Sequence, residues 1–256
     1  MLQLNNPISM QLFHISHTIK NGNLIITDTD TIQQCKKVLR LNVGDLIHLQ
    51  STLANTTTRH LIKITNISET ITGNIIETTC RDALHASPGT DIAPIMIIAM
   101  PNKADKAEII VQKLSEIGVQ KIIFWPAERS VIKERNTNKQ IRLEKIAKEA
   151  VEQSRWRYLP EISFREHPED CIGDWHLTIF DKKETFPKTQ ELAPVLGDKW
   201  SDVALIGPEG GLTANDYTRF KKKSYSITSL GENILRMETA AIIWAWLLKN
   251  HEIISK

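Results

Sequence analysis

The chain reads LIGPEGGLT over residues 205–213 and LGENILRMETA over residues 230–240. Each stretch follows a short apolar run that is typical of a strand, and each opens a helical pattern. We therefore expect both at the carboxyl edge of a parallel sheet, where open α/β sheets bind their ligands. The two stretches predict an α/β fold with a ligand site at that edge.

Glycines dominate the first stretch. Without a Cβ, Gly207, Gly210 and Gly211 can adopt backbone angles closed to other residues and let main-chain groups approach a ligand closely. Thr213 is a candidate helix N-cap, with Asp216 three residues later in a form of the capping box. An ordinary strand-to-helix turn would explain either stretch alone. Two such loops, the second with an arginine and a glutamate, favour a ligand site.

Hydrophobic patterning divides the chain into two domains. Residues 1–77 carry short alternating runs broken by turns, which indicates a small β-rich barrel with one helix. Residues 78–90 read as a linker, and residues 91–256 alternate strands with helices, which indicates a parallel sheet covered on both faces. The strands are expected at 92–100, 120–125, 176–180, 203–206 and 225–228, and the helices at 106–117, 139–154, 213–222 and 234–251.

The composition fits a cytoplasmic enzyme. Among 256 residues, no apolar run approaches the roughly 18 residues of a membrane span. The first residues lack the basic-then-apolar layout of a signal peptide. Cys35, Cys80 and Cys171 are odd in number and form no C-x-x-C pair, which argues against a disulfide scaffold and a cysteine zinc site. We expect neither a metal nor a membrane contact.

The basic residues are unevenly distributed. The formal net charge is only +2, but residues 129–157 hold nine Lys or Arg against four Glu. A solvated helix face explains the Lys and Glu pairs at i,i+4 spacing. It does not explain Arg155-Trp156-Arg157-Tyr158, where cations alternate with aromatic rings as in sites for single-stranded RNA. This segment is a candidate RNA contact.

Motifs for several other chemistries are absent from the sequence. There is no phosphate-binding G-x-x-x-x-G-K-[ST] loop, no G-x-G-x-x-G fingerprint, no H-E-x-x-H and no G-x-S-x-G. The eight histidines show no ligand spacing. The two glycine-bearing loops therefore remain the candidate site.

Both loops closely resemble the paired C-terminal motifs of the RsmE family of ribosomal RNA methyltransferases, which belong to the SPOUT superfamily. Further segments resemble the same family in order along the chain: Val38-Leu39-Arg40 with Gly44-Asp45, residues 106–119, Glu128-Arg129-Ser130-Val131 and residues 149–154. The chain departs from the family pattern at two places. Gln33 and Gln34 stand where the family usually has two histidines, and Arg155-Trp156 stands where it usually has Gly-Arg.

The resemblance implies a SPOUT-type parallel sheet with a C-terminal trefoil knot, preceded by a small PUA-like β-barrel that binds RNA. The knot would comprise residues 205–213 and 229–236 together with the segment after Phe180. The resemblance also implies a homodimer. In agreement, the expected helix at 234–251 is more apolar than one core-facing stripe requires.

The implied activity is the transfer of a methyl group from S-adenosylmethionine to N3 of a uridine in small-subunit (16S) ribosomal RNA. Arg236 would stabilise the charge on the uracil, whereas Glu209 would accept a proton, hold the donor's amine or cap the following turn. The expected donor-binding residues are Ile206, Gly207, Glu209, Gly210, Gly211, Leu230, Gly231, Ile234 and Leu235. The expected RNA-binding residues are Arg40, Arg129, Arg155, Trp156 and Arg157.

Two other functions are compatible with parts of the sequence. One is a catalytically inactive RNA-binding module with a knotted domain, although the intact loops argue against it. The other is a nucleotide-binding metabolic enzyme, for which small substrates would suffice and RNA would be irrelevant. Measured binding of S-adenosylmethionine would separate the first from the methyltransferase.

Overall fold

The computed structural model describes residues 12–15, 17–20, 22–53, 56–82, 94–132, 137–156, 158–181 and 203–250. The chain divides into two compact units. The N-terminal unit comprises residues 1–86 and 151–158, and the C-terminal unit comprises residues 87–150 and 159–256. The segment after residue 150 therefore belongs with the N-terminal strands, although it is far from them in the sequence.

The N-terminal unit is built on a six-stranded sheet. Its elements are β1 (Leu12–His14), β2 (Thr18–Lys20), β3 (Asn23–Ile26), α1 (Thr29–Gln33), the π-helix η1 (Gln34–Val38), β4 (Leu46–Leu53), β5 (Thr56–Ile67) and β6 (Ile71–Asp82). The strand order is β1-β4-β5-β6-β3-β2, and every pair is antiparallel except β1 with β4. Alternate side chains, such as Ile47 and Leu49, point into its apolar core.

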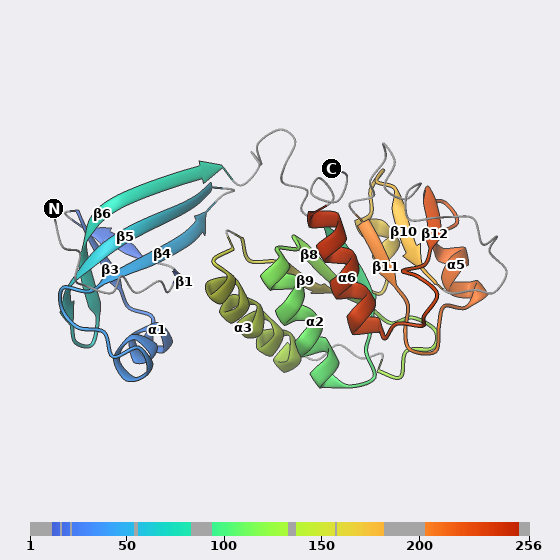
Figure 1. Cartoon of the computed structure of the whole chain (residues 1–256), viewed down its shortest axis with the longest axis horizontal. Helices are drawn as coiled ribbons and strands as arrows, with labels where there is room; N and C mark the ends of the chain where they lie inside the picture. Colours follow the sequence, from blue (N-terminus) through green and yellow to red (C-terminus); the bar gives the residue numbers. More distant parts are fainter. Residues whose placement is uncertain are drawn as a thin grey trace. The chain divides into compact units, whose positions relative to one another are not determined.

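The C-terminal unit is built on a six-stranded sheet in which all strands are parallel. The strands are β7 (Ile95–Ala99), β8 (Lys121–Trp125), β9 (Glu161–Phe164), β10 (Leu177–Phe180), β11 (Val203–Ile206) and β12 (Tyr225–Thr228). Their order is β12-β10-β11-β7-β8-β9 (Figure 1). The predicted α/β class with a parallel sheet is therefore confirmed.

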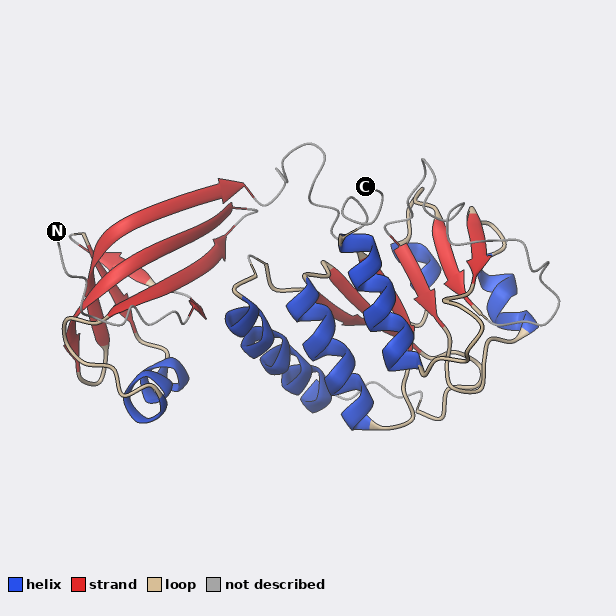
Figure 2. Cartoon of the chain, viewed as in Figure 1, coloured by secondary structure: helices blue, strands red, loops and turns tan. Residues whose placement is uncertain are grey.

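Helices cover both faces of this sheet. They are α2 (Ala104–Ile117), α3 (Thr137–Ser154), the 3-10 helix η2 (Pro168–Cys171), α5 (Ala214–Phe220) and α6 (Met237–Lys249). Met96 and Ile98 pack in one core with α2, α3 and α6, whereas Ile97 and Ala99 pack in a second core with Phe220 of α5. Figure 2 shows α2, α3 and α6 as neighbouring helices on one face. The strands are buried along almost their whole length because helices cover both faces of the sheet.

Several element boundaries differ from the sequence expectation. The boundary expected after residue 77 falls inside β6, which continues to Asp82, because the pairing of β6 with β5 continues to that residue. The short strand β9 was missed, since four residues with mixed burial give little periodic signal. The last helix begins at Met237 rather than residue 234. None of the helices in the described part of the chain is long and apolar enough to cross a membrane.

Candidate functional site

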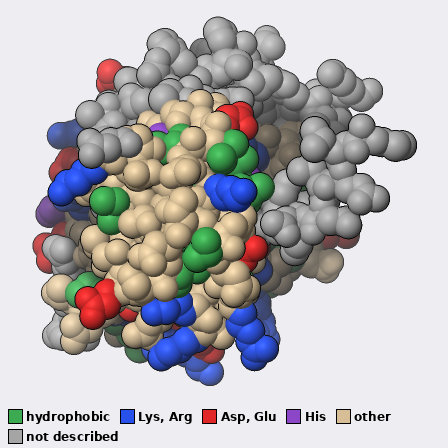
Figure 3. All heavy atoms as spheres, turned by 90° about the vertical axis from the view of Figure 1, so that its left-hand side faces the viewer, with side chains coloured by type: hydrophobic (Ala, Val, Ile, Leu, Met, Phe, Trp, Pro, Cys, Tyr) green, Lys and Arg blue, Asp and Glu red, His purple; other side chains and the backbone are tan. Residues whose placement is uncertain are grey.

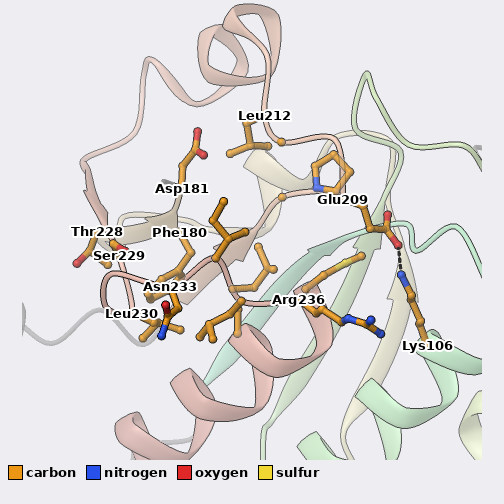
Figure 4. A pocket seen from close by; sticks show the side chains of 18 residues that line it. Lys106, Phe180, Asp181, Glu209, Leu212, Thr228, Ser229, Leu230, Asn233 and Arg236 are labelled. Atoms are coloured by element: carbon orange, nitrogen blue, oxygen red, sulfur yellow. Dashed lines mark hydrogen bonds and ion pairs between the residues drawn. The ribbon is translucent and has the colours of Figure 1, made fainter. Parts of the chain in front are cut away.

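A pocket of about 470 Å³ opens at the carboxyl ends of three adjacent strands of the C-terminal unit. Phe180 ends β10, Ile206 ends β11 and Thr228 ends β12, and all three residues line it (Figure 4). The other lining residues come from the loops after these strands and from α2 and α6: Lys106, Asp181, Gly207, Pro208, Glu209, Gly211, Leu212, Ser229, Leu230, Asn233, Ile234, Leu235, Arg236, Met237 and Ala240. The volume lies within the range of small-molecule sites.

The loop after β11 folds tightly around its glycines. Gly211 has a φ of 75°, a left-handed conformation that favours glycine, and its N–H donates to the carbonyl oxygen of Pro208 at 2.8 Å. A Cβ on Gly207 would lie 2.9 Å from Cγ of Leu212. Larger side chains at these two positions would distort the wall of the pocket.

The segment after β8 holds this loop in place. The Arg129 guanidinium donates to the carbonyl oxygen of Gly210 at 2.7 Å, and the N–H of Glu128 donates to Oδ1 of Asp216 at 3.0 Å. The Thr213 hydroxyl donates to Oε2 of Glu128 at 2.5 Å. Thr213 and Asp216 form the predicted capping box at the start of α5. The contacts of Glu128 and Arg129 therefore fix the loop at Gly210 and at the start of α5, and the local sequence does not reveal these two contacts.

Glu209 forms an ion pair at one end of the pocket. Nζ of Lys106 lies 2.7 Å from Oε1 of Glu209, and the N–H of Asn102 donates to the same oxygen at 3.4 Å. Burial raises the pKa of Glu209, but hydrogen bonds from Lys106 and from backbone N–H groups outweigh it, so the pKa lies below its usual value. A carboxylate with a lowered pKa is a weaker base. Of the three roles expected for Glu209, this disfavours the proton acceptor.

The loop after β12 contributes Arg236. Gly231 has a φ of 115°, and the Ser229 hydroxyl donates to its carbonyl oxygen at 2.8 Å. Arg236 precedes α6 with an extended backbone, and its exposed side chain runs toward Lys106 (Figure 4). No other described side chain is hydrogen-bonded or ion-paired to the Arg236 guanidinium. The Arg236 side chain lines the pocket at the end where Lys106 lies.

Most of the expected donor-binding residues line the pocket, but Gly210 and Gly231 do not. The carbonyl of Gly210 is bonded to Arg129, and Gly231 shapes the turn of the second loop. The sequence interpretation missed four polar residues, namely Lys106, Asp181, Ser229 and Asn233, as well as the buried Thr228. Asp181, Thr228 and Ser229 stand at the ends of strands that the sequence did predict. The same strand-end argument could have found them.

The expected RNA-binding residues are divided between the two units of the chain. Arg40, Arg155 and Trp156 belong to the N-terminal unit, Arg129 belongs to the C-terminal unit, and Arg157 lies outside the described residues. The Arg129 side chain is exposed and its guanidinium donates to the carbonyl of Gly210 in the loop after β11, so its contact with RNA stays a prediction. Arg129 supports the pocket loop.

The Arg155-Trp156 segment is anchored to the N-terminal sheet by its backbone. Arg155 ends α3 with a φ of 55°, and the N–H of Trp156 donates to the carbonyl of Val151 at 3.1 Å, as in a Schellman cap. Arg59 donates to the carbonyl of Arg155 at 3.3 Å, and Gln50 donates to that of Trp156 at 3.4 Å. These bonds present the side chain of Arg155 to solvent.

Basic side chains are visible on the surface of the molecule. Figure 3 shows Lys and Arg side chains gathered toward the lower edge of the view, with hydrophobic side chains scattered singly above them. Within the described ranges, no group of three or more His, Cys, Asp or Glu side chains could hold a metal ion.

Residues 90–249 match a protein family described as an RNA methyltransferase domain. The chain is 32% identical over 151 residues to ribosomal RNA small subunit methyltransferase E of Bacillus subtilis, a match that covers 55% of this chain and 59% of that protein. It is 26% identical over 235 residues to ribosomal RNA small subunit methyltransferase E 2 of Borreliella burgdorferi, covering 86% and 89%.

Two solved structures share the fold. A ribosomal RNA small subunit methyltransferase E from Neisseria gonorrhoeae, bound to S-adenosyl methionine, superposes with a TM-score of 0.74 at 19% identity, covering 94% of this chain and 98% of that one. A methyltransferase of Legionella pneumophila, in complex with the same cofactor, gives 0.72 at 24% identity, covering 94% and 97%. The likeness extends over both units of the chain.

Proposed function

Because the chain belongs to the RNA methyltransferase family, we propose that it transfers a methyl group from S-adenosylmethionine to N3 of a uridine in small-subunit ribosomal RNA. The curated relatives carry the name of a small-subunit ribosomal RNA methyltransferase. The observation that carries the proposal is the pocket at the ends of β10, β11 and β12, with its two glycine-bearing loops.

The residues of the pocket suit S-adenosylmethionine. The volume of about 470 Å³ is adequate for a nucleoside with an amino-acid tail. Main-chain groups of Ile206, Gly207, Leu230 and Leu235 are placed to bind the adenine and ribose. The hydroxyl of Thr228 is buried and has no hydrogen-bond partner among the described residues, so a ligand could supply one.

Catalysis requires the chain to orient the base and to stabilise its charge. When bound, S-adenosylmethionine supplies a methyl group on a sulfonium, which leaves as a neutral thioether. The uridine N3 must release its proton to solvent water, and the resulting negative charge spreads onto the flanking carbonyl oxygens. Arg236 donates hydrogen bonds to that charge as it develops. Glu209 holds Lys106 at the same end of the pocket, so two cations face the base.

RNA binding is assigned to the N-terminal unit as a PUA-like barrel. Arg40, Arg155 and Arg157 contact phosphates, and Trp156 stacks on an unpaired base. The anchoring of the Arg155-Trp156 backbone by Arg59 and Gln50 supports this role. Replacing Arg155 and Arg157 together with Ala should weaken RNA binding without changing donor affinity.

We further propose the trefoil knot, a cytoplasmic homodimer and burial of one face of α6 in the dimer. Asp181 after β10 and the loops after β11 and β12 line one pocket, which supports the knot, whereas residues 182–202 of the expected knot lie outside the described residues. Ile243 and Trp246 on α6 are 37% and 49% exposed, and Ile109 on the neighbouring α2 is 44% exposed. Light scattering should find a dimer, and a monomer at micromolar concentration would contradict it.

Methyl transfer to defined RNA tests the function. Purified protein is incubated with S-adenosylmethionine carrying a labelled methyl group and with small ribosomal subunits or ribosomal RNA from cells that lack the gene. We expect the label in one uridine as 3-methyluridine. Label in another base or in ribose would refute the N3 assignment. If calorimetry detects no donor binding, the result favours the alternative that the protein is a catalytically inactive RNA-binding module.

A further inference from the structure

One face of the N-terminal sheet lies against the Arg155-Trp156 segment. Alternate residues of β4 point into the apolar core, so His48 and Gln50 point to the opposite face. On this face, Nε2 of Gln50 donates to the carbonyl of Trp156 at 3.4 Å, and Nη2 of Arg59 on β5 donates to that of Arg155 at 3.3 Å. Arg59 also donates to Oε1 of Gln50 at 2.9 Å. His48 is the neighbouring residue of β4 on the same face, so it lies beside the segment.

The environment of His48 favours a neutral ring. Burial lowers the pKa of His48, and the positive charges of Arg59 and Arg155 lower it further, whereas the carboxylate of Glu77 on β6 acts in the opposite direction. Nδ1 of His48 is buried with no hydrogen-bond partner among the described residues, but Nε2 is not buried. A proton on Nδ1 would be a buried donor without an acceptor, so we assign the single proton of the neutral ring to Nε2. His48 therefore presents an uncharged N–H donor at the surface.

The same segment carries two aromatic side chains. The rings of Trp156 and Tyr158 meet edge to face, with centroids 6.3 Å apart and an interplanar angle of 84°. A contact of this kind covers only one of the four ring faces of the pair. Both residues are half-buried, so part of each reaches the surface. Aromatic rings at a surface beside cationic side chains are typical of sites where an unpaired base stacks.

We propose that the N-terminal unit has a site for one unpaired nucleotide of RNA, with the phosphate bound by Arg155 and His48. The base contacts the rings of Trp156 and Tyr158. This inference rests on the proposed function and adds to its RNA-binding part. The exposed Arg155 side chain supplies charge and several N–H groups, and His48 supplies one uncharged hydrogen bond. Paired RNA keeps its bases stacked inside the helix, so the site prefers a single strand.

Fluorescence anisotropy tests this inference, with the full-length protein and a labelled single-stranded RNA or a fully paired RNA of the same length. We expect His48→Ala to weaken binding of the single strand by about tenfold with unchanged salt dependence, because a hydrogen bond is lost but no charge. His48→Gln should restore most of the affinity, because its amide nitrogen can replace Nε2. Trp156→Ala should weaken the single strand by about tenfold and leave paired RNA nearly unchanged.

Two variants serve as matched controls. Tyr158→Phe keeps the aromatic ring and should bind as the unaltered protein does. His167→Ala removes an exposed histidine of the C-terminal unit and should have no effect. Thermal unfolding of each variant checks that the fold is intact.

Three outcomes would overturn the inference. Equal affinity of the unaltered protein for the two RNAs would exclude a site for an unpaired nucleotide. Unchanged binding of the single strand by both His48→Ala and Trp156→Ala would place the RNA elsewhere. A reduced salt dependence in His48→Ala would show that the histidine binds as a cation and not as an uncharged donor. If the unaltered protein neither binds RNA nor methylates small ribosomal subunits, the proposed function itself fails, which is a different result from these three.

Discussion

The two units use arginine and glycine differently where the backbone turns left-handed. In the C-terminal unit, the described residues with a positive φ are all glycines, namely Gly118, Gly173, Gly211 and Gly231. In the N-terminal unit, Arg40 and Arg155 also adopt this conformation, with φ of 52° and 55°. A left-handed residue with a Cβ costs about 1–2 kcal/mol. Gly118 and Arg155 both adopt this conformation at the end of a helix, so Arg155 carries a backbone cost that Gly118 avoids.

The largest expected effect concerns Arg236, the arginine of the C-terminal unit that faces the pocket. Arg236→Ala should lower the single-turnover rate of methylation at saturating RNA by about 100-fold, because a donor to developing charge is lost. RNA affinity should change little. If the variant keeps its rate and only requires more RNA, Arg236 is a contact for RNA binding. Both units would then bind RNA through an arginine.

Gly211 tests the need for glycine in the C-terminal unit. Gly211→Val should weaken S-adenosylmethionine binding by at least about tenfold, because a branched residue is strained at its φ of 75° and the pocket loop must rearrange. Calorimetry measures this. Gly210→Ala is the matched control, since its Cβ would meet only the flexible side chain of Arg129 at 3.3 Å. An equal loss of donor affinity in both variants would show that the left-handed backbone of Gly211 is not the reason why glycine is needed there.

Arg155→Gly tests the arginine of the N-terminal unit, and its two effects should have opposite signs. Removal of the left-handed strain should stabilise the protein by about 1 kcal/mol and raise the melting temperature by about 2–4 °C. RNA binding should weaken, with its salt dependence reduced by about one unit of slope. The reverse replacement, Gly118→Arg after α2, should destabilise without improving RNA binding. Unchanged RNA affinity in Arg155→Gly would remove the functional reason for the strain.

The smallest expected effect concerns the Lys106–Glu209 ion pair. The pKa of Glu209 is lowered in the folded state, so the pair stabilises the protein above a pH of about 4.5, the ordinary value, and this stabilisation is lost as the pH falls below it. Both side chains are partly exposed, so we expect less than about 1 kcal/mol. Urea unfolding at neutral and acidic pH should show a smaller pH dependence for Glu209→Gln. An unchanged dependence would mean that the pair orders the pocket without stabilising the fold.

Much of the fold could be predicted because its signals are local. The apolar runs that became β10, β11 and β12, the capping box of Thr213 and Asp216, and the loops that follow the strands are each contained within a few residues. The boundary at β6 was misplaced because the strand's length is set by its partner β5. The hydrogen bond from Arg129 to Gly210 was not predicted, because a charged residue in a sequence does not show which acceptor it meets.

The sequence by itself determined the class of the fold, the two glycine-bearing loops and the presence of Arg236 beside them, because periodicity and turn residues act over short distances along the chain. Only the tertiary structure decided the partners of the charged groups. Lys106 and Glu209 are 103 residues apart, Arg129 and Gly210 are 81 apart, and Tyr217 and Asp181 are 36 apart. The order of the parallel strands brings these residues together, and that order follows from packing of the whole sheet, which no local pattern encodes.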